Sequence, residues 1–351
     1  MTMWLLTIAS VFFSYAVSLK TANRKKTFLI LSGILVVLIL GSRYFINGFT
    51  DEVSYNYEFQ GLRDYDYAKF KSKYSDARDF GFYFVYWILA KIFYFKQFPI
   101  FFITALFVFA SFRFIYKNSE DPLMSVLLIF GFGMFSFYMA GYRQCFAMCF
   151  CLFAFEYAKK KKFLPYIILW AIAFSFHASA IIFLPMYWLV KLNNDKNGKT
   201  WIFFIIVILF ATYSLLMDYA ANWFDNENYT AQKEFSLVGF TIQIVIMLVP
   251  IVLHAIGVCE KQDDNKQFVL LALTLMGICF YALKLAFFSF ERISYYYSFF
   301  IVASFPNSTK LLKKPNENDK AVEVFKYILI ILLIVLCVWR MPENLTYFWN
   351  Y

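Results

Sequence analysis

The chain has few charged side chains: only 16% of its 351 residues are Asp, Glu, Lys or Arg, whereas soluble domains have about 25%. Hydrophobic residues make up 62%, more than one soluble core can hold. This composition excludes soluble enzymes, nucleic-acid-binding proteins and secreted disulfide scaffolds. Because a membrane span needs about 20 apolar residues, it predicts an all-α, polytopic integral membrane protein with about ten to twelve spans.

Cysteine and histidine are also scarce, and their spacing indicates neither a metal site nor a disulfide frame. The chain has 6 cysteines and 2 histidines. No CxxC spacing occurs, so we interpret the cysteines as small packing residues and expect neither a metal nor a cofactor. The first residues have no basic start and no small-residue cleavage site, which predicts a first span rather than a removable signal.

Short basic connectors between the apolar runs predict the orientation of the chain. The strongest is Lys159 to Lys162, a run of lysines that the positive-inside rule places in the cytoplasm. Residues 20–26, 191–199 and 310–320 are similar connectors. If all are cytoplasmic, the segments between them cross the membrane an even number of times, and both termini lie outside. The net charge of +10 then has a topological origin and indicates no nucleic-acid partner.

About twelve spans are expected between these connectors. They are residues 3–19, 27–42, 98–116, 122–140, 143–158, 163–177, 179–190, 200–217, 237–258, 268–287, 293–307 and 321–339. Residues 80–95 form a further apolar run, but another crossing would break the parity. Because that run is short and contains Lys91, we expect it to be re-entrant or interfacial, buried in protein or lining a wet cavity.

Two long polar segments are expected as outer loops, at about residues 43–79 and 218–236. The first is rich in aromatic and charged residues, and the second in acids and amides. We find no internal repeat and no linker to a soluble domain. Residues 1–351 are therefore expected to form a single integral membrane domain.

Ionisable side chains at membrane depth indicate function, because each costs several kcal/mol unless it is paired or hydrated. The predicted topology places a set of them at the outer face: Arg43, Asp51, Asp79, Arg143, His177 and Arg292. Snorkelling residues would not all lie at the face that the positive-inside rule disfavours. Arginines and a histidine around one outer cavity predict a site for an anionic ligand, and a diphosphate is the anion we expect.

Arg143 and His177 are the strongest candidates. Arg143 begins a span between Gly141 and Gln144, where a guanidinium fork suits a phosphate or a carboxylate. A snorkelling arginine is the alternative. His177 lies near the outer end of its span, and the small residues 178–180 after it let the chain turn or another group approach.

Arg292 and Arg43 each allow a functional and a purely structural interpretation. Arg292 has Glu291 beside it, so a local ion pair is an alternative to a ligand contact. Arg43 is followed by Asp51 and Tyr55, a combination that fits a sugar-binding loop and also fits ordinary loop polarity.

The order of these residues resembles that of the EpsG-like polysaccharide polymerases. Residues 141–185 resemble the family's Arg-Gln at a span start, its basic turn, and its Phe-His followed by small residues. Arg43, Asp51 and Tyr55 resemble its Arg…Asp…Tyr pattern, and ERISYYY at Arg292 its late Arg…Tyr. At Asp79 the chain has DFGF, where the family tends to have Glu-Pro-Gly and an aromatic residue. The similarity covers roughly residues 1–305.

The resemblance implies a metal-independent glycosyltransferase of the GT-C type in the bacterial inner membrane. Such an enzyme polymerises polyprenyl-diphosphate-linked oligosaccharide repeat units at the periplasmic face, for a capsule, an exopolysaccharide or an O-antigen. Such an enzyme would lie in the lipid bilayer. Its partners would be a chain-length regulator and a flippase of the same pathway.

A hypothesis for the reaction assigns a role to each candidate. Arg143 and Arg292 would stabilise the leaving lipid diphosphate. His177 would act as general base on the acceptor hydroxyl, or would donate a hydrogen bond to a phosphate. The expected substrate-binding residues are Arg43, Asp51, Tyr55, Asp79 and Gln144.

Other functions stay open on the sequence alone. A membrane transporter would more often have helices broken near the centre and repeated halves, and a flippase of lipid-linked glycans would need polar residues along a path to both faces. A membrane acyltransferase would need a histidine paired with an acid, and a cytoplasmic donor site. A non-catalytic scaffold would keep its activity when Arg143 or His177 is replaced.

Overall fold

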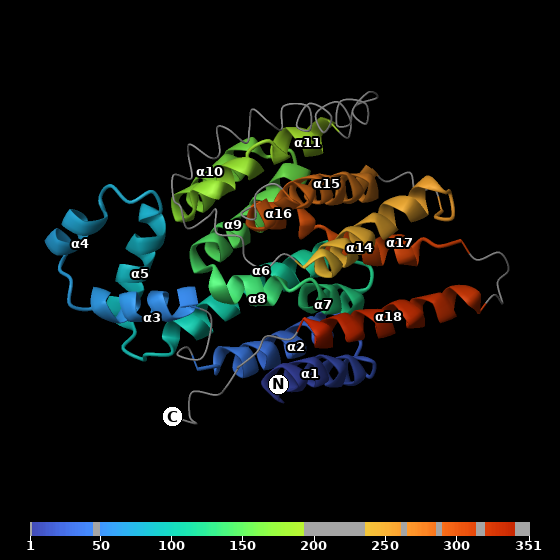
Figure 1. Ribbon diagram of the computed structural model, residues 1–351, viewed down its shortest axis with the longest axis horizontal. Coiled ribbons are helices and arrows are strands. Elements are labelled where there is room, and N and C mark those ends of the chain that lie inside the picture. The colour runs from blue at the N-terminus through green and yellow to red at the C-terminus, as the bar shows by residue number, and fades with distance from the viewer. Residues whose placement is uncertain are drawn as a thin grey trace. The chain divides into compact units, whose positions relative to one another are not determined.

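Apolar segments in a membrane must satisfy their own backbone hydrogen bonds, which a helix does within one segment. The computed structural model describes residues 2–44, 50–192, 236–260, 265–285, 290–313 and 320–340, and their regular structure is helical (Figure 1). In the first half lie α1 (Thr2–Ser18), α2 (Arg24–Gly41), α3 (Thr50–Leu62), α4 (Tyr67–Tyr74), α5 (Phe80–Ile92), α6 (Phe98–Asn118), α7 (Pro122–Gly131), α8 (Met134–Ala140), α9 (Tyr142–Lys159) and α10 (Phe163–Phe176). Then follow η1 (Ala178–Phe183), α11 (Met186–Leu192), α14 (Leu237–Ala255), α15 (Asn265–Ala282), η3 (Leu283–Leu285), α16 (Phe290–Ser298), α17 (Ile301–Lys310) and α18 (Ala321–Trp339).

Among the described residues, 4 helical stretches are long and apolar enough to cross a membrane: α6, α14, Lys266–Leu285 and α18. The bent pair of α7 and α8 makes up to 5 if it is one span. The prediction of an all-helical membrane protein is therefore confirmed. The larger number of spans stays a prediction, and residues 200–217 and nearly all of 218–236 lie outside the described residues.

Several apolar segments that were expected to form one continuous helix are divided into two shorter helices. Residues 122–140, expected as one span, form α7 and α8 with a bend of 55° between them. Gly133 lies in this break with φ of 67°, a conformation that glycine adopts without steric cost. Residues 293–307 are likewise divided between α16 and α17, and Pro185 lies in a turn between η1 and α11.

The expected outer loop at residues 43–79 contains two short helices, α3 and α4. The Asp66 side chain caps α4 by accepting a hydrogen bond from the Lys69 backbone N–H at 2.7 Å. The following helix, α5, has 13 residues and is only about 20 Å long, whereas a bilayer core is about 30 Å thick. The expectation that residues 80–95 are re-entrant or interfacial stays a prediction.

The chain divides into two compact units, and their relative position is not determined. The first unit comprises Met1–Tyr157, Lys162–Leu184 and Ile328–Tyr351, and the second Ala158–Lys161 and Pro185–Tyr327. In the first unit α1, α2 and α6 pack side by side. The Trp4 indole N–H donates to the Cys337 carbonyl at 2.8 Å, which ties α1 to the end of α18. In the second unit the Gln267 amide of α15 donates to the Ser304 carbonyl of α17 at 3.0 Å.

Aromatic rings hold α3, α5, α9 and α10 together within the first unit. Phe82 of α5 meets Tyr55 of α3 and Phe146 of α9, at ring distances of 5.6 and 5.4 Å. Phe146 in turn meets Phe176 at the end of α10, at 5.4 Å. Edge-to-face pairs of this kind stabilise the packing beyond the apolar area they bury. Together they fix the four helix ends that carry the polar residues described below.

We predict that Gly81→Ala destabilises the protein by about 1–3 kcal/mol through overpacking. Gly81 lies against α10, and an added Cβ would come within 2.9 Å of the Ser175 carbonyl oxygen. A backbone atom cannot rotate away, so α5 and α10 would have to separate. Thermal unfolding of the purified full-length protein in detergent measures the change.

Gly61→Ala is the matched control for this substitution. A Cβ at Gly61, on an exposed turn of α3, meets no atom within 4 Å. Alanine there should stabilise the helix by about 0.5–1 kcal/mol. A Gly81→Ala protein as stable as the Gly61→Ala protein would contradict the close packing of α5 on α10.

Candidate functional site

A carboxylate at the start of α5 joins two cationic side chains from distant parts of the sequence. The Asp79 side chain is 6% exposed. Its Oδ2 accepts a hydrogen bond from Arg143 Nη1 at 2.8 Å and lies 3.2 Å from His177 Nδ1. Its Oδ1 accepts from the Ala178 backbone N–H at 3.3 Å. The structure therefore joins in direct contact three of the residues that the sequence predicted around one cavity.

The backbone around His177 explains how this contact forms. His177 ends α10 in an extended conformation, with φ of −159° and ψ of 123°, and η1 begins at the next residue. This break leaves the Ala178 N–H without a partner in α10. The small side chains of Ala178 and Ser179 then let Asp79 reach that N–H, as the sequence predicted for another approaching group.

The surroundings of Asp79 favour its charged form. Burial alone would raise the pKa of this carboxyl, but the hydrogen bond and charge of His177 and the charge of Arg143 outweigh it. The pKa of Asp79 is consequently held below its ordinary value of 3.8. The cluster thus combines a fixed anion with an arginine and a histidine.

Arg143 and His177 remain partly open, at 34% and 29% side-chain exposure. Arg143 uses Nη1 for Asp79 and donates from Nε to the Tyr55 hydroxyl at 3.2 Å. Within the described part of the chain, Arg143 Nη2 and His177 Nε2 make no hydrogen bond. The Arg143 Nη2 amino group and one ring nitrogen of His177 are therefore available to a ligand beside a shared carboxylate.

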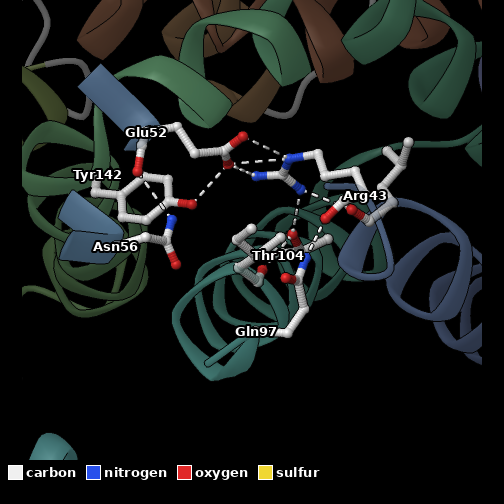
Figure 2. Close-up of polar contacts among 8 residues, drawn as sticks. Arg43, Glu52, Asn56, Gln97, Thr104 and Tyr142 are labelled. Atoms are coloured by element: carbon white, nitrogen blue, oxygen red, sulfur yellow. Dashed lines mark hydrogen bonds and ion pairs between the residues drawn. The ribbon is translucent and has the colours of Figure 1, made fainter. Parts of the chain in front are cut away.

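A second polar network, around Arg43, is fully buried (Figure 2). The Arg43 side chain is 1% exposed and forms an ion pair with Glu52. Its Nε lies 3.0 and 3.2 Å from the two Glu52 oxygens, and its Nη1 donates to Thr104 Oγ1 at 3.0 Å. The Tyr142 hydroxyl donates to Glu52 Oε1 at 2.6 Å, and the Gln97 amide donates to the Arg43 carbonyl.

Tyr55 connects the two networks. Its ring stacks on Tyr142, with centroids 4.9 Å apart and planes 9° from parallel, and its hydroxyl accepts from Arg143. Glu52, Tyr55 and Asn56 lie on one face of α3, because residues three and four apart are neighbours on a helix. The Arg43–Glu52 pair therefore fixes the helix that positions Arg143.

The other predicted site residues have different surroundings. Arg43 is buried against Glu52, whereas Asp51 is exposed on the first turn of α3. Gln144 is buried next to Arg143 on α9. Arg292 lies on α16 in the second unit, and its neighbour Glu291 pairs with Lys284 at 2.8 Å. Direct roles for these residues stay predictions.

Glu52 is the residue that sequence reasoning missed. It follows the predicted Asp51 directly, but residues 43–79 were expected as a loop, so no helical face was considered. The spacing of Glu52, Tyr55 and Asn56, together with an arginine nine residues before Glu52, was the available signal.

We predict that Glu52→Gln strongly destabilises the protein, by about 3–5 kcal/mol, because the buried Arg43 guanidinium loses its counter-ion. The measurement is thermal unfolding in detergent, with the amount of protein in the membrane as a second readout. Asp64→Asn removes an acid from an exposed position after α3 and should change stability by no more than about 0.5 kcal/mol. Equal stability of the two variants would show that the ion pair is dispensable.

The lowered pKa of Asp79 predicts how stability depends on pH. A depressed pKa contributes stability that is complete above the ordinary value of 3.8 and is lost as the pH falls through the lower, folded value. The stability advantage of wild type over Asp79→Asn should persist from about pH 8 to about pH 5 and vanish only in stronger acid. Thermal unfolding of both proteins over this range tests it, and an advantage that fades already above pH 5 contradicts it.

Comparison with known proteins supplies the family. The family model described as "EpsG family" matches residues 5–351, essentially the whole chain. The comparisons with curated proteins and with solved structures gave no match. The family match agrees with the resemblance seen in the sequence and extends it to the C-terminal residues. The chain belongs to the EpsG family of Wzy-like polysaccharide polymerases, which act as glycosyltransferase-like enzymes in the membrane.

Proposed function

We propose that this chain joins polyprenyl-diphosphate-linked oligosaccharide repeat units into a bacterial surface polysaccharide. The reaction takes place at the periplasmic face of the inner membrane and needs no metal. The product is a capsule, an exopolysaccharide or an O-antigen. A flippase supplies the substrate and a chain-length regulator limits the product.

The observation that carries this proposal is the Asp79 carboxylate shared by Arg143 and His177. A polymerase must bind a diphosphate and remove a proton from a sugar hydroxyl. Arg143 offers a cationic donor, and His177 offers a ring nitrogen, on the same carboxylate oxygen. The partial exposure of both lets a ligand reach them.

In the reaction, the acceptor hydroxyl attacks the anomeric carbon of the donor sugar. A new carbon–oxygen bond forms, and the bond from that carbon to the diphosphate oxygen breaks. The lipid diphosphate leaves with the electron pair, and the hydroxyl proton passes to His177 Nε2. A proton on Nδ1 that donates to Asp79 leaves Nε2 as the acceptor. This arrangement favours the general-base role over the phosphate-binding role.

Arg143 stabilises the charge that grows on the leaving diphosphate. Its Nε and Nη1 are held by Tyr55 and Asp79, so the direction of Nη2 is set before the substrate binds. A preorganised donor of this kind contributes about 10²–10³ in rate. We keep for Arg292 the role that the sequence suggested, a second cation for the diphosphate.

The remaining candidate residues bind the substrate or position the helices around it. Tyr55 and Gln144 contact the sugar or the diphosphate beside Arg143, and Asp51 binds a sugar hydroxyl at the exposed start of α3. Arg43 acts through Glu52 by fixing α3. The whole chain forms one integral membrane domain with about twelve spans and a GT-C-like fold, in which residues 80–95 are re-entrant or interfacial.

The test is the length of the glycan in a host whose chromosomal copy is deleted, complemented with wild type, Arg143→Ala, Arg143→Lys, His177→Ala or Asp79→Asn at matched membrane abundance. Wild type should make polymer ladders, and each variant should accumulate single lipid-linked repeats. Arg143→Lys should also fail, because an ammonium cannot hold Tyr55 and Asp79 as the guanidinium fork does.

Lys71→Ala, which removes an exposed cation from α4, is the control and should make ladders of wild-type length. Ladders of normal length from Arg143→Ala would overturn the site assignment. If deletion itself leaves polymer length intact, a transporter or flippase becomes the better explanation. The His177–Asp79 pair also meets one requirement of an acyltransferase, so loss of acyl groups without loss of ladders would favour that activity.

A further inference from the structure

An apolar groove of about 620 Å³ lies between α2 and α6, away from the candidate active site. Its walls include Ile30, Ile34, Leu38 and Phe109, whose side chains are 52–60% exposed. At its floor Gly33 lets the helices approach, since a Cβ there would lie 3.3 Å from Val108. Such exposed apolar side chains on membrane helices are covered by lipid chains.

One end of the groove is basic. Lys26 and Arg113 line it together with Tyr116, and the Lys25 ammonium lies 5.6 Å from the centre of the Tyr116 ring. Lys26 and Arg113 are exposed and form no ion pair with any of the residues described. Two uncompensated cations at the end of an apolar groove are complementary to a lipid with an anionic headgroup.

The two helices run antiparallel, which places this basic end far from the polar networks. Lys25 at the start of α2 donates to the Ser119 carbonyl after α6, whereas Arg43 after α2 meets Thr104 in the first half of α6. The groove extends along α2 from Lys26 to Leu38, a rise of about 18 Å. This is somewhat more than half of a hydrocarbon core of about 30 Å, the depth that one leaflet provides.

The basic end belongs to the residue 20–26 connector, which the positive-inside rule places in the cytoplasm. Anionic phospholipids are recognised there by basic side chains between membrane helices. From the groove, its charge and its length, we infer that α2 and α6 form a binding site for an anionic phospholipid of the cytoplasmic leaflet. One acyl chain fills the groove, and Lys26 and Arg113 bind the phosphate.

The test uses the purified full-length protein in nanodiscs of phosphatidylcholine that contain increasing amounts of phosphatidylglycerol. Native mass spectrometry after release counts the retained lipids, and thermal unfolding measures the stabilisation. Wild type should retain phosphatidylglycerol in preference to phosphatidylcholine. The double variant Lys26→Gln with Arg113→Gln should lose that preference, with binding weaker by about thirtyfold.

Two further variants make the result specific. Lys20→Gln with Arg24→Gln removes the same charge from exposed positions at the same corner but outside the groove, and should keep the preference. Ile34→Trp fills the groove from an exposed position and should reduce the retention of both lipids.

Three outcomes would overturn the inference. One is a wild-type protein without preference for phosphatidylglycerol. Another is an equal loss of preference in the Lys20/Arg24 variant, which would mean general surface attraction. The third is displacement of bound phosphatidylglycerol by a polyprenyl phosphate, which would make the groove a site for the lipid carrier. Every variant must elute as a single folded species. If the double variant does not fold, lipid retention by the folded Ile34→Trp protein tests the inference instead.

Discussion

The buried ion pair of Arg43 and Glu52 is the interaction on which the geometry of the first unit depends. A guanidinium removed from water requires a counter-ion and further hydrogen-bond acceptors. Glu52, the Leu40 carbonyl and Thr104 supply them, from the start of α3, the end of α2 and the first half of α6. One charge therefore fixes three helices, and Tyr142 adds a fourth by donating to the same carboxylate.

The Arg43–Glu52 pair positions the candidate site through two further contacts. Tyr55 is placed on Tyr142 because both belong to helices that Glu52 anchors, and Arg143 is placed by Tyr55 and Asp79. The buried network pairs one arginine with one glutamate, and both side chains are shielded from solvent. The Asp79 cluster is partly exposed, and its arginine and histidine still have nitrogen atoms available to a ligand. This division between a closed and an open network is the electrostatic basis of the proposed polymerase.

Much of the candidate site could be predicted from the sequence, because ionisable residues in apolar runs are conspicuous. Asp79, Arg143 and His177 were identified in this way, and the lysine connectors predicted that they share one face of the membrane. Their joint contact could not be predicted, since Asp79 and His177 are 98 residues apart and meet only through the packing of α5 on α10. Glu52 was missed because the polar residues 43–79 were expected as a loop, so the helical spacing of Glu52, Tyr55 and Asn56 was not considered. The breaks at Gly133 and between α16 and α17 were hidden by continuous apolar runs, in which periodicity does not mark a bend.

Tyr55 uses its two ends for different neighbours, the ring for Tyr142 and the hydroxyl for Arg143. A bound anion that draws the guanidinium toward itself therefore pulls on a ring clamped to the buried network. Tyr55 is therefore the shortest connection between the partly exposed Arg143 and the buried network of α3 and the end of α2. Replacing this one aromatic side chain would separate the two networks without removing a charge from either.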